Sequence, residues 1–105
     1  MKPEKKVNYY KSGKVEYEGY FINGKLHRPD GPAYIGYCES GKIEFEGYYI
    51  NGEHHCLGGP AVISYHKSGK VDYEWYYVNG KQLTEEQIEE VKFNKMFDKE
   101  LMEIL

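Results

Sequence analysis

One stretch of the sequence occurs almost three times at a fixed spacing of 28 residues. The copies SGKVEYEGYFINGK, SGKIEFEGYYINGE and SGKVDYEWYYVNGK begin at Ser12, Ser40 and Ser68. A fixed period in this range indicates a repeat architecture, whose units stack because none can bury its apolar face alone. We therefore align the chain in three rows, beginning at residues 8, 36 and 64, and expect all 105 residues to form one domain.

Each row alternates strand patterns with turn signals. Asn23-Gly24 and its two equivalents predict type I′ hairpin turns, and the Ser-Gly pairs predict a second, weaker turn. Between these turns, apolar and acidic residues alternate with a period of two, which is typical of a strand. Gly19 and Gly47 interrupt the strands and predict a bend. The expected fold is mainly β: a bent antiparallel β-meander of three 28-residue repeats with one C-terminal α-helix.

The helix is predicted from Thr84 to Leu105. Thr84 and Gln87 form a capping-box pattern, and neither glycine nor proline follows. We assign residues 1–83 to the repeats and residues 84–105 to a capping helix of the same domain. One helix face carries Phe93, Met96, Phe97, Leu101 and Ile104, and the opposite face carries Ile88, Val91 and Met102.

Only one of these helix faces is needed to cover the end of the stack. The second face is either also internal or pairs with another chain. In the second case we expect a homodimer formed through Ile88, Val91 and Met102.

Composition and charge limit the function. The formal net charge of −3 argues against direct binding of nucleic acid. No run of about 18 apolar residues predicts a membrane segment, and the N-terminus lacks the apolar run of a signal peptide. Cys38 and Cys56 do not occupy equivalent positions of the rows, so we expect a reduced, cytoplasmic protein.

The segments YFINGKLHRPDGPA and YYINGEHHCLGGPA, preceded by SGKVEYEG, resemble MORN-like repeats. They are most similar to the variant with an NGKxHRxDGPA core found in bacterial, phage and giant-virus proteins, related to YwqK-type antitoxin-like repeats. The resemblance covers residues 9–83, although the second row lacks the arginine and the aspartate. It implies a non-catalytic module for protein contacts, and the antitoxin label implies a role in neutralising a partner.

Metal and cofactor sites are not expected. His54, His55 and Cys56 are adjacent, and Cys38 and His66 share a column of the alignment. However, neighbouring residues of a strand point to opposite faces, and no metal-ligand spacing is present. The sequence therefore predicts neither metal nor cofactor.

The acidic residues recur in every row. They predict a solvated face or an acidic docking strip for a basic partner. Acid–base catalysis would require two carboxylates whose environments push their pKa values apart, and a row of carboxylates repeated in the same pattern does not provide that. Because the serines also precede turn glycines, we expect no enzymatic activity. The predicted strip consists of Glu16, Glu18, Glu44, Glu46, Asp72 and Glu74.

The chain contains 12 tyrosines, 4 phenylalanines and one tryptophan. So many rings suit a protein-binding surface, core and cross-strand pairs, or base stacking. Besides the acidic strip, the predicted partner-binding residues are Tyr20, Tyr48, Tyr76 and Trp75.

Three functions remain open from the sequence. The first is a protein that inhibits a partner by occupying its surface, such as an antitoxin-like protein or a phage-encoded inhibitor of a host defence protein, for example a basic nuclease. The second is a protein that sequesters a nucleotide or similar small ligand between tyrosines. The third is a structural repeat that associates with itself through the helix.

Overall fold

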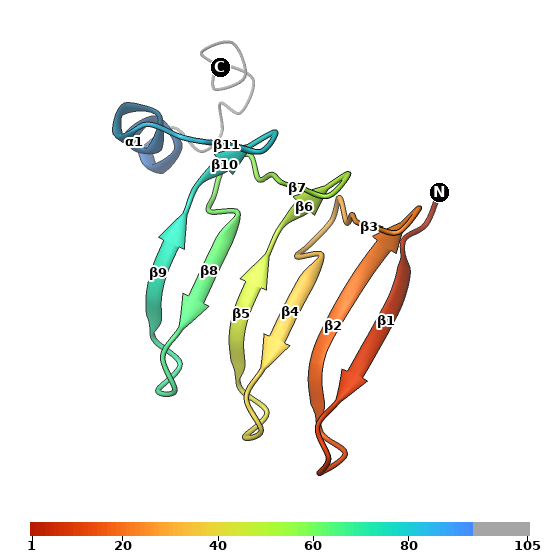
Figure 1. Cartoon of the computed structure of the whole chain (residues 1–105). Helices are drawn as coiled ribbons and strands as arrows, with labels where there is room; N and C mark the ends of the chain where they lie inside the picture. The colour runs from red at the N-terminus through yellow and green to blue at the C-terminus, as the bar shows by residue number, and fades with distance from the viewer. Residues whose placement is uncertain (94–105) are drawn as a thin grey trace.

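A computed structural model describes residues 1–93 as one long antiparallel sheet, two small two-stranded sheets and a short helix at one end (Figure 1). Three long hairpins, β1–β2, β4–β5 and β8–β9, stand side by side in the order β1-β2-β4-β5-β8-β9, and β3 pairs with β2. Above them lie the two-stranded sheets β6–β7 and β10–β11. The elements are β1 (Glu4–Tyr9), β2 (Val15–Ile22), β3 (Lys25–Leu26), β4 (Tyr34–Tyr37), β5 (Ile43–Gly47), β6 (Tyr49–Ile50), β7 (Glu53–His54), β8 (Val62–Tyr65), β9 (Val71–Trp75), β10 (Tyr77–Val78), β11 (Lys81–Gln82) and α1 (Glu85–Phe93).

The expected mainly β, antiparallel fold with a C-terminal helix is confirmed. The Asn-Gly turns have the backbone that the sequence predicts. Asn23 and Gly24 have φ of 51° and 76°, and the equivalent pairs of the other rows are similar. Two successive residues with positive φ define the type I′ turn, which matches the twist of the strands that it joins.

The Ser-Gly turns lie at the opposite ends of the long hairpins. The N–H of Gly13 donates to the Tyr10 carbonyl at 2.9 Å, and the Tyr10 N–H donates to the Lys14 carbonyl at 2.8 Å. Gly13 has φ of 91°. Next to this turn the pairing of β1 with β2 shifts in register between Asn8 and Tyr9, which is a β-bulge. The other long hairpins have equivalent shifts. This bulge changes which way the next side chains of the strand point.

The mid-strand glycines make room for aromatic rings. A Cβ on Gly19 would lie 2.6 Å from Cε1 of Phe21, and one on Gly47 would lie 2.8 Å from Cε1 of Tyr49. The predicted bend is clear in the second row, where β5 ends at Gly47 and β6 begins at Tyr49, whereas β2 runs through Gly19. Glycine is therefore required here because a ring lies against the backbone.

Extended linkers join the hairpins along the stack. Ala33 accepts a hydrogen bond from the Tyr20 N–H at 2.8 Å and donates one to the Gly47 carbonyl at 2.9 Å. Ala61 makes the equivalent bonds to Tyr48 and Trp75, and both alanines are fully buried. Each linker thus bonds to the hairpin before it and the hairpin after it.

Helix α1 begins with the predicted capping box. Thr84 Oγ1 accepts from the Gln87 N–H at 3.2 Å, and Gln87 Oε1 accepts from the Thr84 N–H at 2.9 Å. The helix packs on the end of the stack in a cluster that comprises Tyr76, Val78, Leu83 and Val91, with Leu57 and Ile88 at its margin. No helix in the described part of the chain is long and apolar enough to cross a membrane.

This packing corrects two predictions. Val91, predicted to lie on a free dimerisation face, is only 3% exposed, and Ile88 packs beside it. Tyr76, predicted to contact a partner, is 7% exposed in the same cluster. The reason is that Ile88 and Val91 are on the capping face of the helix, while Phe93 is exposed. Met96, Phe97, Leu101, Met102 and Ile104 lie outside the described residues, as does the predicted helix beyond Phe93.

Replacing Gly19 by alanine should destabilise the protein by about 1–3 kcal/mol, because the new methyl group must displace the Phe21 ring. Gly36→Ala is the matched control, since its Cβ would meet its nearest neighbours at an ordinary 3.7 Å. The control should be neutral or slightly stabilising. Urea unfolding of both variants measures the difference, and equal stabilities would contradict the proposed role of the ring.

Val91→Ala should cost about 2 kcal/mol of unfolding free energy, because it leaves a cavity between the helix and the last hairpin. Phe93→Ala is the control on the same helix and should change stability by less than about 0.5 kcal/mol, because Phe93 is 77% exposed. Thermal and urea unfolding report both values. A larger loss for Phe93→Ala would show that the helix is oriented differently.

Candidate interaction surface

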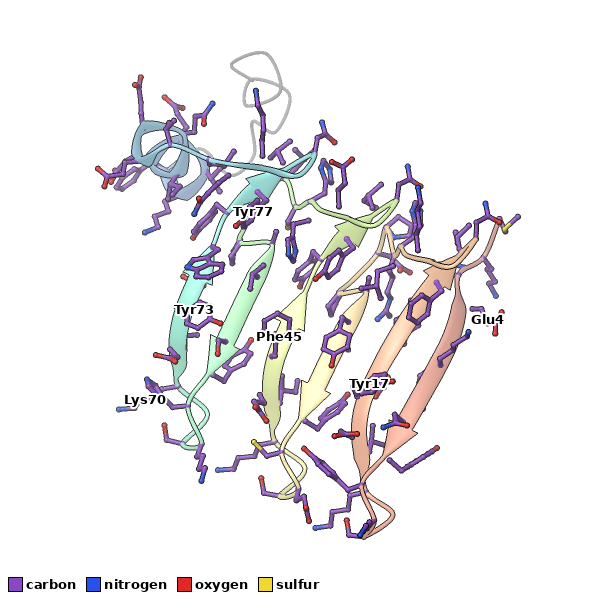
Figure 2. The ribbon with its side chains drawn as sticks, in the orientation of Figure 1. Glu4, Tyr17, Phe45, Lys70, Tyr73 and Tyr77 are labelled. Atoms are coloured by element: carbon purple, nitrogen blue, oxygen red, sulfur yellow. The ribbon has the colours of Figure 1, made fainter. Side chains whose placement is uncertain are left out.

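One side of the long hairpins carries a row of rings, which we call the aromatic face: Tyr17, Tyr34, Phe45, Tyr73 and Trp75. The register places them on one side, since Gly19 is opposite Tyr34, Gly36 is opposite Phe45, and Val62 is opposite Trp75. Figure 2 shows Tyr17, Phe45 and Tyr73 from β2, β5 and β9 along this side of the sheet.

The rings of the aromatic face form two groups. Tyr34 lies between Tyr17, with ring centroids 5.4 Å apart and stacked, and Phe45, at 5.9 Å and edge-on. Tyr73 and Trp75 form the second group, at 4.9 Å. On β8, between the groups, the corresponding positions carry Val62 and Ser64, which are too small to bridge them. Trp75 occupies the position in the third row that Gly19 and Gly47 occupy in the first two rows. Its side chain is 47% exposed, and Tyr73 is also exposed.

Above the aromatic face, His54 lies between two tyrosines. Its ring centroid is 4.3 Å from that of Tyr49 and 5.1 Å from that of Tyr77. Burial lowers the pKa of His54 despite a hydrogen bond with the Tyr48 backbone, and its Nδ1 atom is buried without a hydrogen bond among the described residues. The neutral ring therefore serves as a packing element between the second and third rows.

The bulges divide the predicted acidic strip between the two sides of the sheet. Glu16 accepts a hydrogen bond from Asn8 Nδ2 at 2.5 Å, and Asn8 is opposite Tyr17, so Glu16 lies on the side of the aromatic face. Glu18 is opposite Ile35 and lies on the other side. A uniform acidic strip, expected from strict alternation, is therefore wrong, because the bulge at the Ser-Gly turn shifts the phase of the strand.

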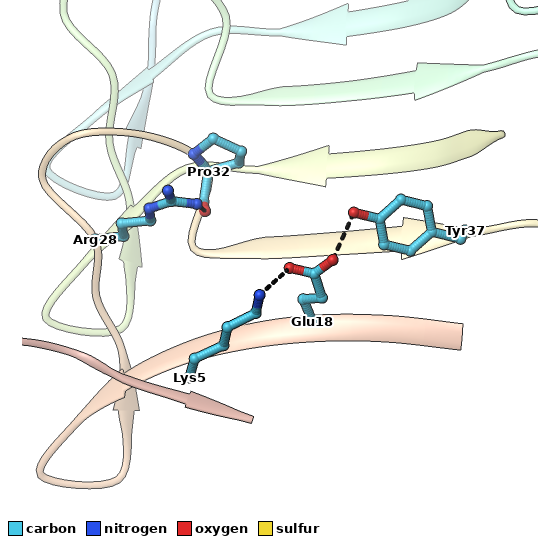
Figure 3. Close-up of polar contacts among 5 residues, drawn as sticks. All are labelled: Lys5, Glu18, Arg28, Pro32 and Tyr37. Atoms are coloured by element: carbon cyan, nitrogen blue, oxygen red, sulfur yellow. Dashed lines mark hydrogen bonds and ion pairs between the residues drawn. The ribbon is translucent and has the colours of Figure 1, made fainter. Parts of the chain in front are cut away.

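On the side away from the aromatic face, Glu18 and Glu46 are each bonded to the next hairpin. Tyr37 donates to Glu18 at 2.7 Å, and Lys5 lies 3.2 Å from the same carboxylate (Figure 3). Tyr65 donates to Glu46 in the second copy of this contact. These glutamates have a structural role, which uniform spacing in the sequence does not reveal.

The bond between Tyr37 and Glu18 shifts the pKa of both partners. Burial by itself raises the pKa of Glu18, but the hydrogen bonds from Tyr37 and Lys5 outweigh it and leave that pKa below its usual value. Burial, and then the bond to Glu18, raise the pKa of Tyr37 to about 12. Tyr65 is raised to about 12 for the same reasons, with Glu46 as its partner.

Glu16 and Glu44 lie near the aromatic rings. Burial, followed by the charges of Tyr17, Glu16 and Glu44, raises the pKa of Tyr34. These two carboxylates also line a hollow of about 410 Å³ with Tyr10, Tyr34 and Phe45, open to solvent. Carboxylates beside ring faces favour a cationic group, and most of all a guanidinium, which stacks on rings and bonds to carboxylates.

The tyrosines predicted to bind a partner lie between the hairpins. The Arg28 guanidinium lies 4.0 Å from the ring centroid of Tyr20. It also donates to the Pro32 carbonyl at 3.1 Å (Figure 3). These two contacts hold the first linker on the Tyr20 ring. Tyr48 is partly buried in the equivalent position of the next row. Of the predicted rings, only Trp75 lies on the aromatic face. The sequence analysis missed Tyr17, Tyr34 and Tyr73, and strand periodicity was the available signal.

Other predicted groups remain apart. Cys38 Sγ lies 3.6 Å from Glu44, and His66 Nε2 lies 3.3 Å from Asp72, so each residue pairs with the acid of its own hairpin. His27 and His55 instead accept backbone N–H groups of Asn51 and Asn79 at 3.0 Å through Nδ1. Within residues 1–93, no three histidine, cysteine or acidic side chains come together as a metal site would require.

Comparison with protein-family models, curated proteins and solved structures finds no significant match to this chain. The resemblance to MORN-like repeats thus stays a prediction from the motif residues.

Replacing Tyr37 by phenylalanine should raise the pKa of Glu18, because burial would then be opposed only by Lys5 and the charge of Arg28. The pKa of Glu18 in the folded wild type lies below its unfolded value, so its stabilisation is present at neutral pH and is lost as the pH falls through the folded-state pKa. The variant should lose part of that acid-dependent stability. NMR titration of the Glu18 carboxyl carbon measures the shift. Tyr9→Phe is the control and should leave this pKa unchanged.

Proposed function

We propose that this protein is a non-enzymatic binding protein that acts by covering the surface of another protein with its aromatic face. The observation that carries the proposal is that one side of a single-layer sheet presents five rings, and no other element of the described chain covers them. The fold measures 46 × 35 × 19 Å, in keeping with one layer of strands and its side chains. Tyr73 and Trp75 are exposed and the other three rings are partly exposed, and exposed apolar surface of this kind marks interaction sites.

The chemistry of the aromatic face favours a basic protein as partner. Tyr73 and Trp75 offer rigid contact area at low entropic cost and belong to the residue types that dominate binding energy. Glu16 and Glu44 place negative charge beside Tyr34. An arginine-rich surface, such as the nucleic-acid channel of a nuclease, combines the cations and planar groups that suit this arrangement. We extend the proposal to inhibition by occupying such a channel, as an antitoxin-like or phage-encoded inhibitor of a host defence protein would act.

A protein partner fits the geometry better than a nucleotide does. Small-ligand sites bury most of the surface of their ligand. The hollow beside Tyr34 and Phe45 is instead open to solvent, and the second ring pair lies two strands away on β9. The rings are thus spread over a wide and shallow surface, as in a protein–protein contact.

Paired alanine substitutions test the proposal. Tyr73→Ala with Trp75→Ala should weaken capture of a partner from a lysate of the native source by at least about tenfold, since such rings commonly contribute about 2 kcal/mol each. Phe93→Ala is the matched control, because this ring is exposed on the helix away from the aromatic face, and it should capture the same partner as the wild type. Quantitative mass spectrometry of the captured proteins measures both effects.

Salt provides a second readout of the same experiment. Capture by the wild type should fall as salt rises, because charge steers the partner to Glu16 and Glu44. Equal capture by the wild type and the double variant would overturn the proposal. A rise in melting temperature with nucleotides, abolished by the same double variant, would favour the small-ligand function instead.

A further inference from the structure

The long sheet has two open edges. In the order β1-β2-β4-β5-β8-β9, the strands β1 and β9 each pair on one side only. Every residue of β9, Val71–Trp75, is exposed. Figure 1 shows β9 at one end of the stack with helix α1 beside its upper end only. Open edges carry unpaired backbone N–H and C=O groups and are templates for another strand.

Contacts between successive hairpins follow one rule within the chain. Glu18 is opposite Ile35 and accepts the Tyr37 hydroxyl, and Glu46 is opposite Ile63 and accepts the Tyr65 hydroxyl. The two contacts are related by a shift of 28 residues. Each needs an acid on the second strand of one hairpin and a tyrosine on the first strand of the next.

The two edges each hold one half of this contact. Glu74, on β9, is the equivalent of Glu18 and Glu46, but within residues 1–93 no strand pairs with the outer side of β9. Tyr9, on β1, is the equivalent of Tyr37 and Tyr65, but no strand of the described residues pairs with the outer side of β1, and Tyr9 is 58% exposed. Within residues 1–93 neither the Tyr9 hydroxyl nor the Glu74 carboxylate makes a hydrogen bond.

We propose that copies of this protein associate head to tail, with β1 of one copy added to β9 of the next. The internal register then applies, with Glu74 opposite Val7 of the second copy and the hydroxyl of that copy's Tyr9 donating to Glu74. β1 suits this place, since its Val7-Asn8-Tyr9 matches Ile35-Gly36-Tyr37 and Ile63-Ser64-Tyr65 in having a β-branched residue, a small residue and a tyrosine.

Charge favours this pairing over the two symmetric ones. β9 carries Asp72 and Glu74 and no basic residue, whereas β1 carries Lys5 and Lys6 against one acid, Glu4. Pairing β9 with β9, or β1 with β1, would bring like charges together across the strands, which is destabilising. The head-to-tail register instead places Lys6 opposite the exposed ring of Trp75, where it gains a cation–π contact like the one it makes with Phe21 at 5.5 Å.

Helix α1 limits the contact to the long hairpins. Leu83 occupies the position in the third row that His27 and His55 occupy in the first two. Each of these histidines accepts a backbone N–H group from the Asn-Gly turn of the next row. The leucine side chain has no acceptor, so this hydrogen bond cannot continue into another copy. Association is therefore weaker than the contacts within the chain and depends on concentration. Because the two edges differ, the contact does not close a dimer and allows further copies to add.

Two edge-blocking variants test the proposal on the purified full chain. Tyr9→Asp places an acid against Glu74 and blocks the β1 edge, and Trp75→Lys places a cation against Lys6 and blocks the β9 edge. Both positions are exposed, and circular dichroism with urea unfolding verifies the fold. In sedimentation velocity, the mass of the wild type should rise with concentration, and each variant alone should remain monomeric. An equal mixture should form a heterodimer through its one unblocked pair of edges.

Milder substitutions isolate the shared hydrogen bond and serve if a blocking variant fails to fold. Tyr9→Phe and Glu74→Gln should each weaken association by about tenfold, as expected for a hydrogen bond to a charged group. The double variant should associate no more weakly than the weaker of the two single variants, because Tyr9→Phe removes the bond that Glu74→Gln weakens by removing its charge. Additive effects would overturn the assigned contact.

Three results would overturn the proposal. They are a wild type that stays monomeric at about 1 mM, a mixture of blocked variants that forms no heterodimer, and association that is lost with Phe93→Ala but kept in Tyr9→Asp. The last result would place the interface on the helix. Tyr9→Asp changes none of the five rings of the aromatic face, so its capture of a partner can be measured apart from its association. A failure of the head-to-tail contact is therefore distinguishable from a failure of the proposed binding function.

Discussion

Each hairpin of this protein is stabilised by its neighbours along the stack, because no second layer covers the sheet within the part of the chain that the structure describes. An isolated hairpin is marginally stable in water, and several strands with an apolar face are needed for a stable fold. The contacts between hairpins recur: Tyr37 bonds to Glu18, the Asn51 N–H donates to His27, and the linker passes through buried Ala33. The stack depends on these cross-links, and its ends are where they stop.

At the end of the stack formed by the third row, the upper and lower parts of the stack differ in what covers them. In the upper part, helix α1 packs Val91 on Tyr76, Val78 and Leu83 and so covers the end of the third row. In the lower part, nothing in the described chain covers β9. Both proposals follow from this arrangement, because a single layer leaves rings on its face and backbone groups on its edges. The two sites meet at Trp75, whose ring belongs to the aromatic face and whose backbone belongs to the β9 edge.

The local structure was largely predictable from the sequence, and the division of side chains between the faces was not. The Asn-Gly turns and the Thr84–Gln87 capping box depend on residues close in the chain, so their chemistry is visible in the sequence. The prediction of one acidic strip is wrong because a bulge beside the Ser-Gly turn changes the side of the sheet to which the following side chains point. No residue type in the sequence marks this bulge. Tyr20 and Tyr48 were misjudged for a related reason, since their cover comes from linkers that fold back over the preceding hairpin.

The sequence by itself determined the unit, its turns and its repetition, because these follow from short-range backbone preferences and a fixed 28-residue spacing. Only the tertiary structure decided which rings are exposed. Tyr76 and Trp75 are adjacent in the chain, yet the helix buries one while the other stays exposed on the open last strand. Exposure depends on what arrives from a distant part of the chain or from the next hairpin, and no local pattern encodes that.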